Sequence, residues 1–179
     1  SLAASSGTSV GVSAAGLDTR NQVATKVQAF IDGSNGVRTT AGDITLSAED
    51  TSTVNADAQA VSLAGSLAGS TGVAVSVGLS MARNTIESDV VAEIRNAALV
   101  DASTGAIALT ADKSSTVTAT STAASVAASL SGTTGVAFSG AGAEATNVIL
   151  GKANAGVGNS TLNSAGDVTL DAENASTIK

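Results

Sequence analysis

The sequence contains no cysteine, histidine, proline, tryptophan or tyrosine, and its only aromatic residues are Phe30 and Phe138. Without cysteine it can form no disulfide scaffold and no thiolate metal site. Without histidine or cysteine it also lacks the common pairs of catalytic base and nucleophile, so we expect no enzymatic activity. A net charge of −7 makes a poor nucleic-acid surface, because phosphates need cations and bases need stacking platforms.

The sequence also lacks any long apolar run, so we expect no transmembrane segment. Apolar residues make up 43% of the 179, but alanine dominates among them. Small side chains allow backbones to approach closely and so favour a narrow core. Such a core is typical of a slim solenoid rather than of a thick two-layer domain.

A unit of about 63 residues occurs almost three times. Residues 72–77 recur at 135–140, and residues 42–48 recur at 105–111 and again at 166–172. A fixed internal period marks a repeat array rather than a globular enzyme.

The whole chain is predicted to form one array, with copies at roughly residues 1–61, 62–124 and 125–179. The third copy is two residues shorter, and the gap falls between Val157 and Gly166. A length change confined to one place indicates a loop. Because the chain begins and ends inside a copy, we expect it to be a piece of a longer repetitive protein.

Apolar and small residues alternate over ten positions of the second copy, which predicts a strand. Its expected inward face consists of Val73, Val75, Val77, Leu79 and Met81. Two further strands are expected to point their apolar residues inward: Val90, Ala92 and Ile94 in the first, and Ile107, Leu109 and Ala111 in the second. Residues 116–130 are rich in alanine, a helix former, but their β-branched threonine and valine favour a strand.

These patterns predict an all-β fold, a β-solenoid similar to a parallel β-helix and built from repeats of about 63 residues. Each repeat would supply roughly three coils of about 21 residues or two of about 31, stacked about 4.8 Å apart. The sequence leaves both divisions open. It also leaves open a protruding hairpin around residues 132–135.

Residues 159–172 resemble the coil motif of filamentous haemagglutinin-type adhesins, in which a Gly-Asp-(Val/Ile)-Thr-Leu-x-Ala core recurs along a long parallel β-helix. Residues 42–48 match this core well, and residues 105–111 match it with Ala106 and Ala108 replacing the polar pair. The full unit resembles repeat regions of very large bacterial surface proteins. This resemblance implies export, a fibrous rod and an adhesive or structural role.

Two sets of residues are expected at structural turns. Asn21, Asn84 and Asn147 occupy one position of the repeat, where turn asparagines can stack on one another and tolerate the left-handed conformation. The glycines expected to mark turns are Gly42, Gly105 and Gly166.

An acidic column is formed by Glu49, Asp112 and Glu173. Carboxylate oxygens at a turn could bind Ca²⁺, although the EF-hand and nonapeptide calcium patterns are both absent. A solvated charged turn is the favoured interpretation, and no other cofactor is expected.

A flat threonine array on one strand is typical of ice-binding solenoids. Its members are Thr116, Thr118, Thr120 and Thr122. The equivalent residues of the first copy are Thr53, Asn55, Asp57 and Gln59, so the array does not repeat. An ordinary exposed strand is therefore favoured.

The function expected from the sequence is that of a structural segment in an extracellular or cell-surface bacterial fibre, stalk or adhesin shaft. One alternative is a binding module that uses a flat solenoid face for a glycan, for ice or for a host or neighbouring cell surface. Another is a filament subunit, because uncapped coils can associate head to tail through unpaired strand edges.

Overall fold

The structure, a computed structural model, describes all 179 residues. It contains fourteen strands and no helix, so no helix is present that could span a bilayer. The strands stack in parallel on equivalent strands of neighbouring repeats. The predicted all-β, solenoid-like fold is therefore confirmed.

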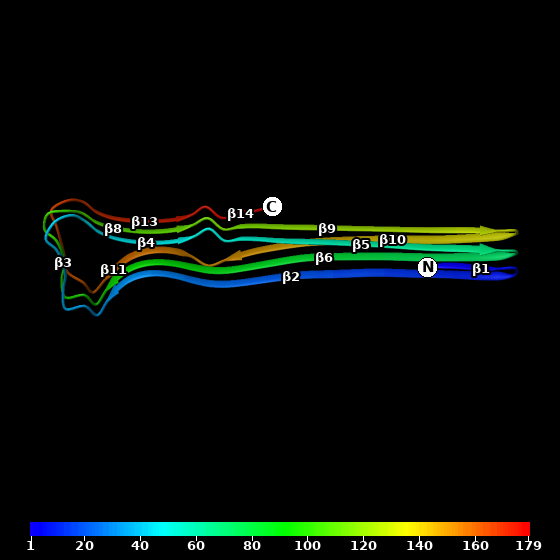
Figure 1. The fold of residues 1–179 in the computed structure, drawn as a ribbon, viewed down its shortest axis with the longest axis horizontal. Coiled ribbons are helices and arrows are strands. Elements are labelled where there is room, and N and C mark those ends of the chain that lie inside the picture. The colour runs from blue at the N-terminus through cyan, green and yellow to red at the C-terminus, as the bar shows by residue number, and fades with distance from the viewer. The chain divides into compact units, whose positions relative to one another are not determined.

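The strands form four sheets, each composed of equivalent segments of the repeat. The first sheet contains β1 (Leu2–Ser5), β5 (Thr53–Ala68), β9 (Thr116–Ser131) and β14 (Thr177–Ile178). The second contains β2 (Thr8–Asp32), β6 (Thr71–Arg95), β10 (Thr134–Leu150) and β11 (Ala153–Gly158). The third contains β3 (Val37–Thr39), β7 (Val100–Ala102) and β12 (Leu162–Ser164), and the fourth contains β4 (Ile44–Asp50), β8 (Ile107–Lys113) and β13 (Val168–Asn174). Figure 1 shows β4, β8 and β13 side by side.

The register of these sheets shows that one repeat makes one coil. Ile44 pairs with Ile107, and Val37 pairs with Val100, a full 63 residues further along the chain. The division of each repeat into two or three coils is therefore wrong. Strands such as β6, with 25 residues, continue through the positions where shorter coils would have to turn. β9 and β10 likewise pair with equivalent strands rather than with each other, so they form no hairpin.

The two-residue gap of the third copy is divided between two loops. The offset between paired residues is 63 at Gly158 and Arg95, and it falls to 62 at Leu162 and Val100. It falls again to 61 at β13 and β8, where Val168 pairs with Ile107. One residue is thus missing on each side of β12, and every sheet keeps its equivalent residues aligned.

The chain forms two compact units, each assembled from three segments. Unit 1 comprises Ser1–Asn21, Asn55–Asn84 and Ala119–Asn147. Unit 2 comprises Gln22–Val54, Thr85–Thr118 and Val148–Lys179. The two units have different interiors.

Three sheets surround the core of unit 2. Val90 and Ile94 come from β6, Val100 from β7, and Ile107 and Leu109 from β8, and all five side chains are fully buried. The inward orientation predicted for Val90, Ala92 and Ile94, and for Ile107, Leu109 and Ala111, is confirmed. The first three residues continue β6 and do not form the separate strand that was predicted. Burying a side chain of this size contributes roughly 1.5–3 kcal/mol, so this cluster is a major source of stability for the unit.

Unit 1 has the opposite arrangement, with small residues inside and large ones outside. Ala74, Ser76 and Ala82 of β6 are buried, whereas Val77 and Leu79 are 40% and 54% exposed. The inward orientation predicted for Val73, Val75, Val77, Leu79 and Met81 is therefore wrong. The alternation itself is confirmed, because these residues do share one face of a strand.

The reason for this inversion is the close approach of the two sheets of unit 1. The Ser76 hydroxyl donates to Ser62 Oγ across the gap at 2.8 Å, and Ser80 Oγ donates to the Ala58 carbonyl at 2.7 Å. A Cβ atom at Gly78 would lie only 2.7 Å from the Ala124 carbonyl oxygen. Over residues 58–82 the inward positions of β5 and β6 hold only glycine, alanine and serine, and the valine and leucine side chains of this stretch lie on the outer face.

This geometry predicts that Ala74→Leu destabilises the protein by about 1–3 kcal/mol, because the extra atoms must force the two sheets apart. The matched control is Val75→Leu, which enlarges the neighbouring side chain on the outer face and should change stability little. Urea unfolding monitored by circular dichroism measures both. Equal destabilisation by the two variants would contradict the narrow interior.

Candidate functional site

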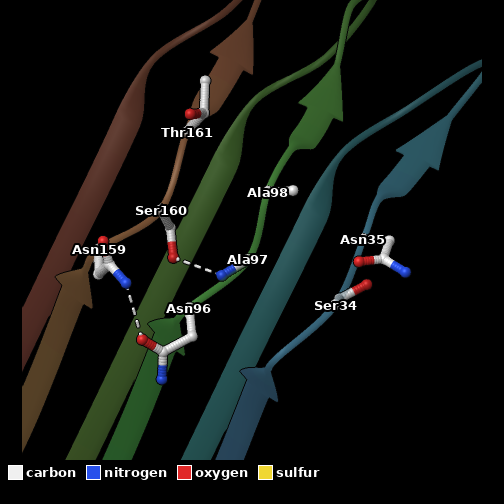
Figure 2. A pocket seen from close by; sticks show the side chains of 8 residues that line it. All are labelled: Ser34, Asn35, Asn96, Ala97, Ala98, Asn159, Ser160 and Thr161. Carbon is white, nitrogen blue, oxygen red and sulfur yellow. Dashed lines mark hydrogen bonds between the residues drawn. The ribbon is translucent and has the colours of Figure 1, made fainter.

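A polar groove of about 520 Å³ lies in unit 2, where the chain passes from the second sheet to the third. Its lining residues come from three equivalent loops: Ser34 and Asn35 from the first, Asn96, Ala97 and Ala98 from the second, and Asn159, Ser160 and Thr161 from the third. Figure 2 shows the three loops side by side, with Asn159 next to Asn96 and Ser160 next to Ala97. The groove therefore arises from the repeat itself.

One column of this groove adopts the left-handed backbone conformation. Its members are Gly33, Asn96 and Asn159, with φ angles of 63°, 51° and 46°. Asparagine and glycine are the residues that tolerate this region most readily. The sequence prediction placed the turn asparagines elsewhere. The signal in the sequence that could have located this turn is the exchange of glycine and asparagine at one repeat position, Gly33, Asn96 and Asn159.

The side chains of this column form a hydrogen-bonded ladder. Asn159 Nδ2 donates to Asn96 Oδ1 at 3.0 Å, as Figure 2 shows, and Asn96 Nδ2 donates to Asp32 Oδ1 at 3.2 Å. Hydrogen bonds from Asn96 and Arg95 hold the pKa of Asp32 below its usual value. Asparagine thus fixes the turn and also links one coil to the next.

The remaining polar groups of the groove are mostly engaged with backbone. Ser160 Oγ accepts from the Ala97 amide at 3.0 Å and donates to the Gly158 carbonyl at 2.9 Å. Ser34 Oγ accepts from the Gly36 amide at 3.2 Å. The groove offers neutral hydrogen-bonding groups, and neither a nucleophile paired with a base nor a charged side chain lines it.

The predicted asparagine column lies within strands rather than at turns. Asn21, Asn84 and Asn147 belong to β2, β6 and β10. Asn21 Nδ2 donates to Asn84 Oδ1 at 2.9 Å, and Asn84 Nδ2 donates to Asn147 Oδ1 at 3.0 Å. Asn21 Nδ2 also donates to the Asn55 carbonyl at 2.8 Å, which ties the two sheets of unit 1 together. The position in the fold was wrongly predicted, but the residues do stack.

The three predicted glycines each lie in the bend that precedes a strand of the fourth sheet. Gly42 has a φ angle of 98°, which disfavours any residue with a side chain. At Gly105 the limit is space, because an added Cβ atom would overlap Gly42 and would lie 2.6 Å from Asp43 Oδ1. Gly166 is less restricted, with the Ala106 Cβ atom 3.3 Å from the equivalent point.

The predicted acidic column is aligned along the fourth sheet. Glu49 pairs with Asp112, and Asp112 pairs with Glu173, on adjacent parallel strands. No group of three or more His, Cys, Asp or Glu side chains in the structure lies close enough together to hold a metal ion. The threonine array, Thr116 to Thr122, lies along β9 with its side chains partly or largely exposed.

A buried carboxylate lies next to the acidic column. Asp50 is 6% exposed, and its Oδ1 atom accepts from the Ser52 amide at 3.0 Å and from the Ser52 hydroxyl. Its Oδ2 atom accepts from the Ser88 and Ser115 hydroxyls. Burial by itself would raise the pKa of Asp50, but these hydrogen bonds outweigh it and hold the pKa below its usual value. The equivalent residue of the next coil is Lys113, which is fully buried and donates to the Leu150 carbonyl at 2.7 Å.

No family model, no curated protein and no solved structure matches the chain. The resemblance to haemagglutinin-type adhesins therefore stays a prediction that depends on the motif residues alone.

The left-handed turn predicts that Asn96→Gly and Asn96→Ala differ in stability. Both variants lose the amide ladder, but only alanine must also adopt a strained backbone conformation, which costs about 1–2 kcal/mol. Urea unfolding should therefore show the alanine variant to be less stable than the glycine variant by about that amount. The first coil supports this choice of control, because glycine stands at the same position there.

The Asp50 network predicts a loss of stability in acid. A carboxylate whose pKa is lowered on folding stabilises the protein above its unfolded pKa, about 4, and this contribution disappears as the pH falls through the folded value. The free energy of unfolding should therefore fall as the pH drops below about 4. Asp50→Asn should flatten this dependence, while Glu49→Gln, at the exposed neighbour, should leave it in place. Parallel curves for wild type and Asp50→Asn would refute this role for Asp50.

Proposed function

We propose that this chain is a structural segment of an extracellular bacterial surface protein, and that it acts as part of a fibre, stalk or adhesin shaft. The observation that supports the proposal most directly is the use of polar side chains. Asn21 bonds to Asn84, Asn96 bonds to Asn159, and Asn163 bonds to Asp101, each pair being equivalent residues of successive coils. Side chains used in this way extend a stack, and they repeat because the stack repeats.

The charged side chains support the same interpretation. Arg38 pairs with Asp101 of the next coil at 2.8 Å, and Asn163 of the third coil donates to the same carboxylate. Arg95 pairs with Asp32 of the coil before it at 3.0 Å and lies 5.4 Å from the Phe30 ring centroid. Charges of opposite sign thus lie one above the other. This arrangement favours one stacking register over a slipped one.

The resemblance to haemagglutinin-type adhesins supports an extracellular location. Residues 42–48, 105–111 and 166–172, which carry that resemblance, form the aligned sheet of β4, β8 and β13. The motif therefore occupies a position where each copy contacts the next. Glycan or ice binding by an outer face, which is the alternative derived from the sequence, stays a prediction.

A shaft should tolerate a change in its number of coils. Inserting a second copy of residues 62–124 after residue 124 is expected to add one coil of about 4.8 Å and to raise the urea midpoint, because each coil adds a stabilising interface. The matched control inserts only 31 residues from the same segment, which cannot complete a coil and should lower the midpoint. A lower midpoint after the full insertion would contradict the proposal.

The proposed location has its own test. Antibodies raised against the purified chain should label intact cells of the producing bacterium, and protease treatment of those cells should remove the label. Labelling that requires cell lysis would contradict an extracellular shaft even if the insertion behaves as expected.

A further inference from the structure

The larger part of unit 1 carries no charged side chain. Residues 1–17, 58–82 and 119–143 contain no aspartate, glutamate, lysine or arginine. The outer side of β1, β5 and β9 in this region carries six exposed aliphatic side chains, which we call the leucine face. Its members and their exposed fractions are Leu2 (83%), Val61 (73%), Leu63 (61%), Leu67 (54%), Val126 (56%) and Leu130 (69%).

These side chains cannot be buried within the unit. The inward positions of β5 hold only alanine and serine in this stretch, and Ser62 and Ser66 are engaged in hydrogen bonds across the gap. Backbone amides of the middle strand are hydrogen-bonded along the sheet: the Gly65 amide donates to the Ser1 carbonyl and the Gly69 amide to the Ser5 carbonyl. The side chains of the leucine face therefore offer a partner apolar area rather than charge.

We propose that the leucine face packs against the leucine face of a second copy of this chain, related to the first by a two-fold axis. Its side chains form a regular lattice, with columns about 4.8 Å apart across the strands and about 6.6 Å apart along them. A second face with the same two spacings can interdigitate with it, as two sheets do at a separation of about 10 Å. Without charges the face cannot select a partner of opposite charge, so matching geometry is what remains.

The available area indicates a weak, reversible pair. Over the seven residues from Val61 to Leu67, β5 and β9 span roughly 10 by 23 Å, and β1 adds the part beside Gly65 to Leu67, which gives about 270 Å² in projection. A standard stable interface buries about 800 Å² on each partner. Three coils therefore fall short of a permanent dimer, and each additional coil of the same kind would add about 100 Å².

The opposite face of unit 1 fits this partner less well. Gly140 and Gly142 leave two outer positions of β10 without side chains, and Gly142 borders a hollow lined by Leu79, Met81 and Glu144. Glu144 also forms an ion pair with Arg83 at 3.3 Å on this side.

Sedimentation equilibrium of the full chain over a wide concentration range tests the pairing. The wild type should shift reversibly from one chain towards two, and sodium sulfate should strengthen the shift, because this salt favours apolar association. The double variant Leu63→Lys/Val126→Lys should stay monomeric and keep the wild-type circular dichroism spectrum. The control is Gln59→Lys, which places a single lysine on one of the same strands, outside the leucine face, and should pair as the wild type does.

Cross-linking locates the contact, because the chain has no cysteine of its own. β5 is the middle strand of the leucine face, so the two Leu63 side chains of a symmetric pair lie near the axis. Leu63→Cys should form a disulfide-linked dimer on mild oxidation. Leu79→Cys, with a similar exposed fraction but on the opposite face, should not.

Three results would overturn this proposal. The first is a wild type that stays monomeric up to its solubility limit. The second is equal loss of pairing in the Gln59→Lys control. The third is a chain that stays monomeric in solution but floats with neutral phosphatidylcholine vesicles, which would assign the face to lipid. None of these results bears on the shaft proposal, because that proposal depends on stacking between coils.

Discussion

The structure depends on one constraint: the chain returns to its starting point only after a full repeat, so each residue lies directly above its equivalent in the previous copy. Parallel pairing at an offset of 63 places Ile44 on Ile107 and Val90 on Ala153. Equivalent residues of successive copies therefore form a column, in which neighbouring members lie about 4.8 Å apart. A side chain must suit its own column as well as its own strand. Columns of asparagine satisfy this requirement, because each amide can donate to one neighbour and accept from the other.

The same constraint produces two different interiors. In unit 2 three sheets enclose a space wide enough for Ile94, Val100 and Leu109, and the hydrophobic effect stabilises it in the usual way. In unit 1 two sheets lie so close that Ser62 and Ser76 hydroxyls meet, and alanine fills the remaining columns. Close packing and hydrogen bonds must then provide much of the stability that large buried side chains provide in unit 2.

The sequence predicted the repeat, the all-β class and the alternation correctly, because these depend on local periodicity. It was wrong to separate the strand that begins near Val73 from the one that contains Val90, because both belong to β6. Val90, Ile94 and Leu109 were oriented correctly since they enclose a conventional core. Val77 and Leu79 were not, because alternation shows that two faces differ and does not show which one is buried. That choice depends on the distance between sheets, which local sequence does not contain. The number of coils per repeat could not be predicted from local patterns either, because it depends on where the chain turns. Asparagine does not mark the turns, since it occurs both at a turn (Asn96) and within a strand (Asn84).

The candidate site follows the same logic. The motif glycines and the acidic column could be aligned from the sequence alone, whereas the groove beside Asn96 and Asn159 required knowledge of which loops stack. Because the groove is built from columns, its polar atoms form hydrogen bonds largely between coils.

The outward positions are less restricted, because a side chain that points away from the interior of its unit can change without disturbing the stack. Arg38 and Arg95 accordingly form their ion pairs at outer positions of unit 2, whereas charged side chains are absent from most of unit 1. Each coil repeats this division, so any weak contact made by the uncharged outer surface is multiplied by the number of coils. Stacking thus converts a small apolar area per repeat into an association whose strength depends on the length of the stack.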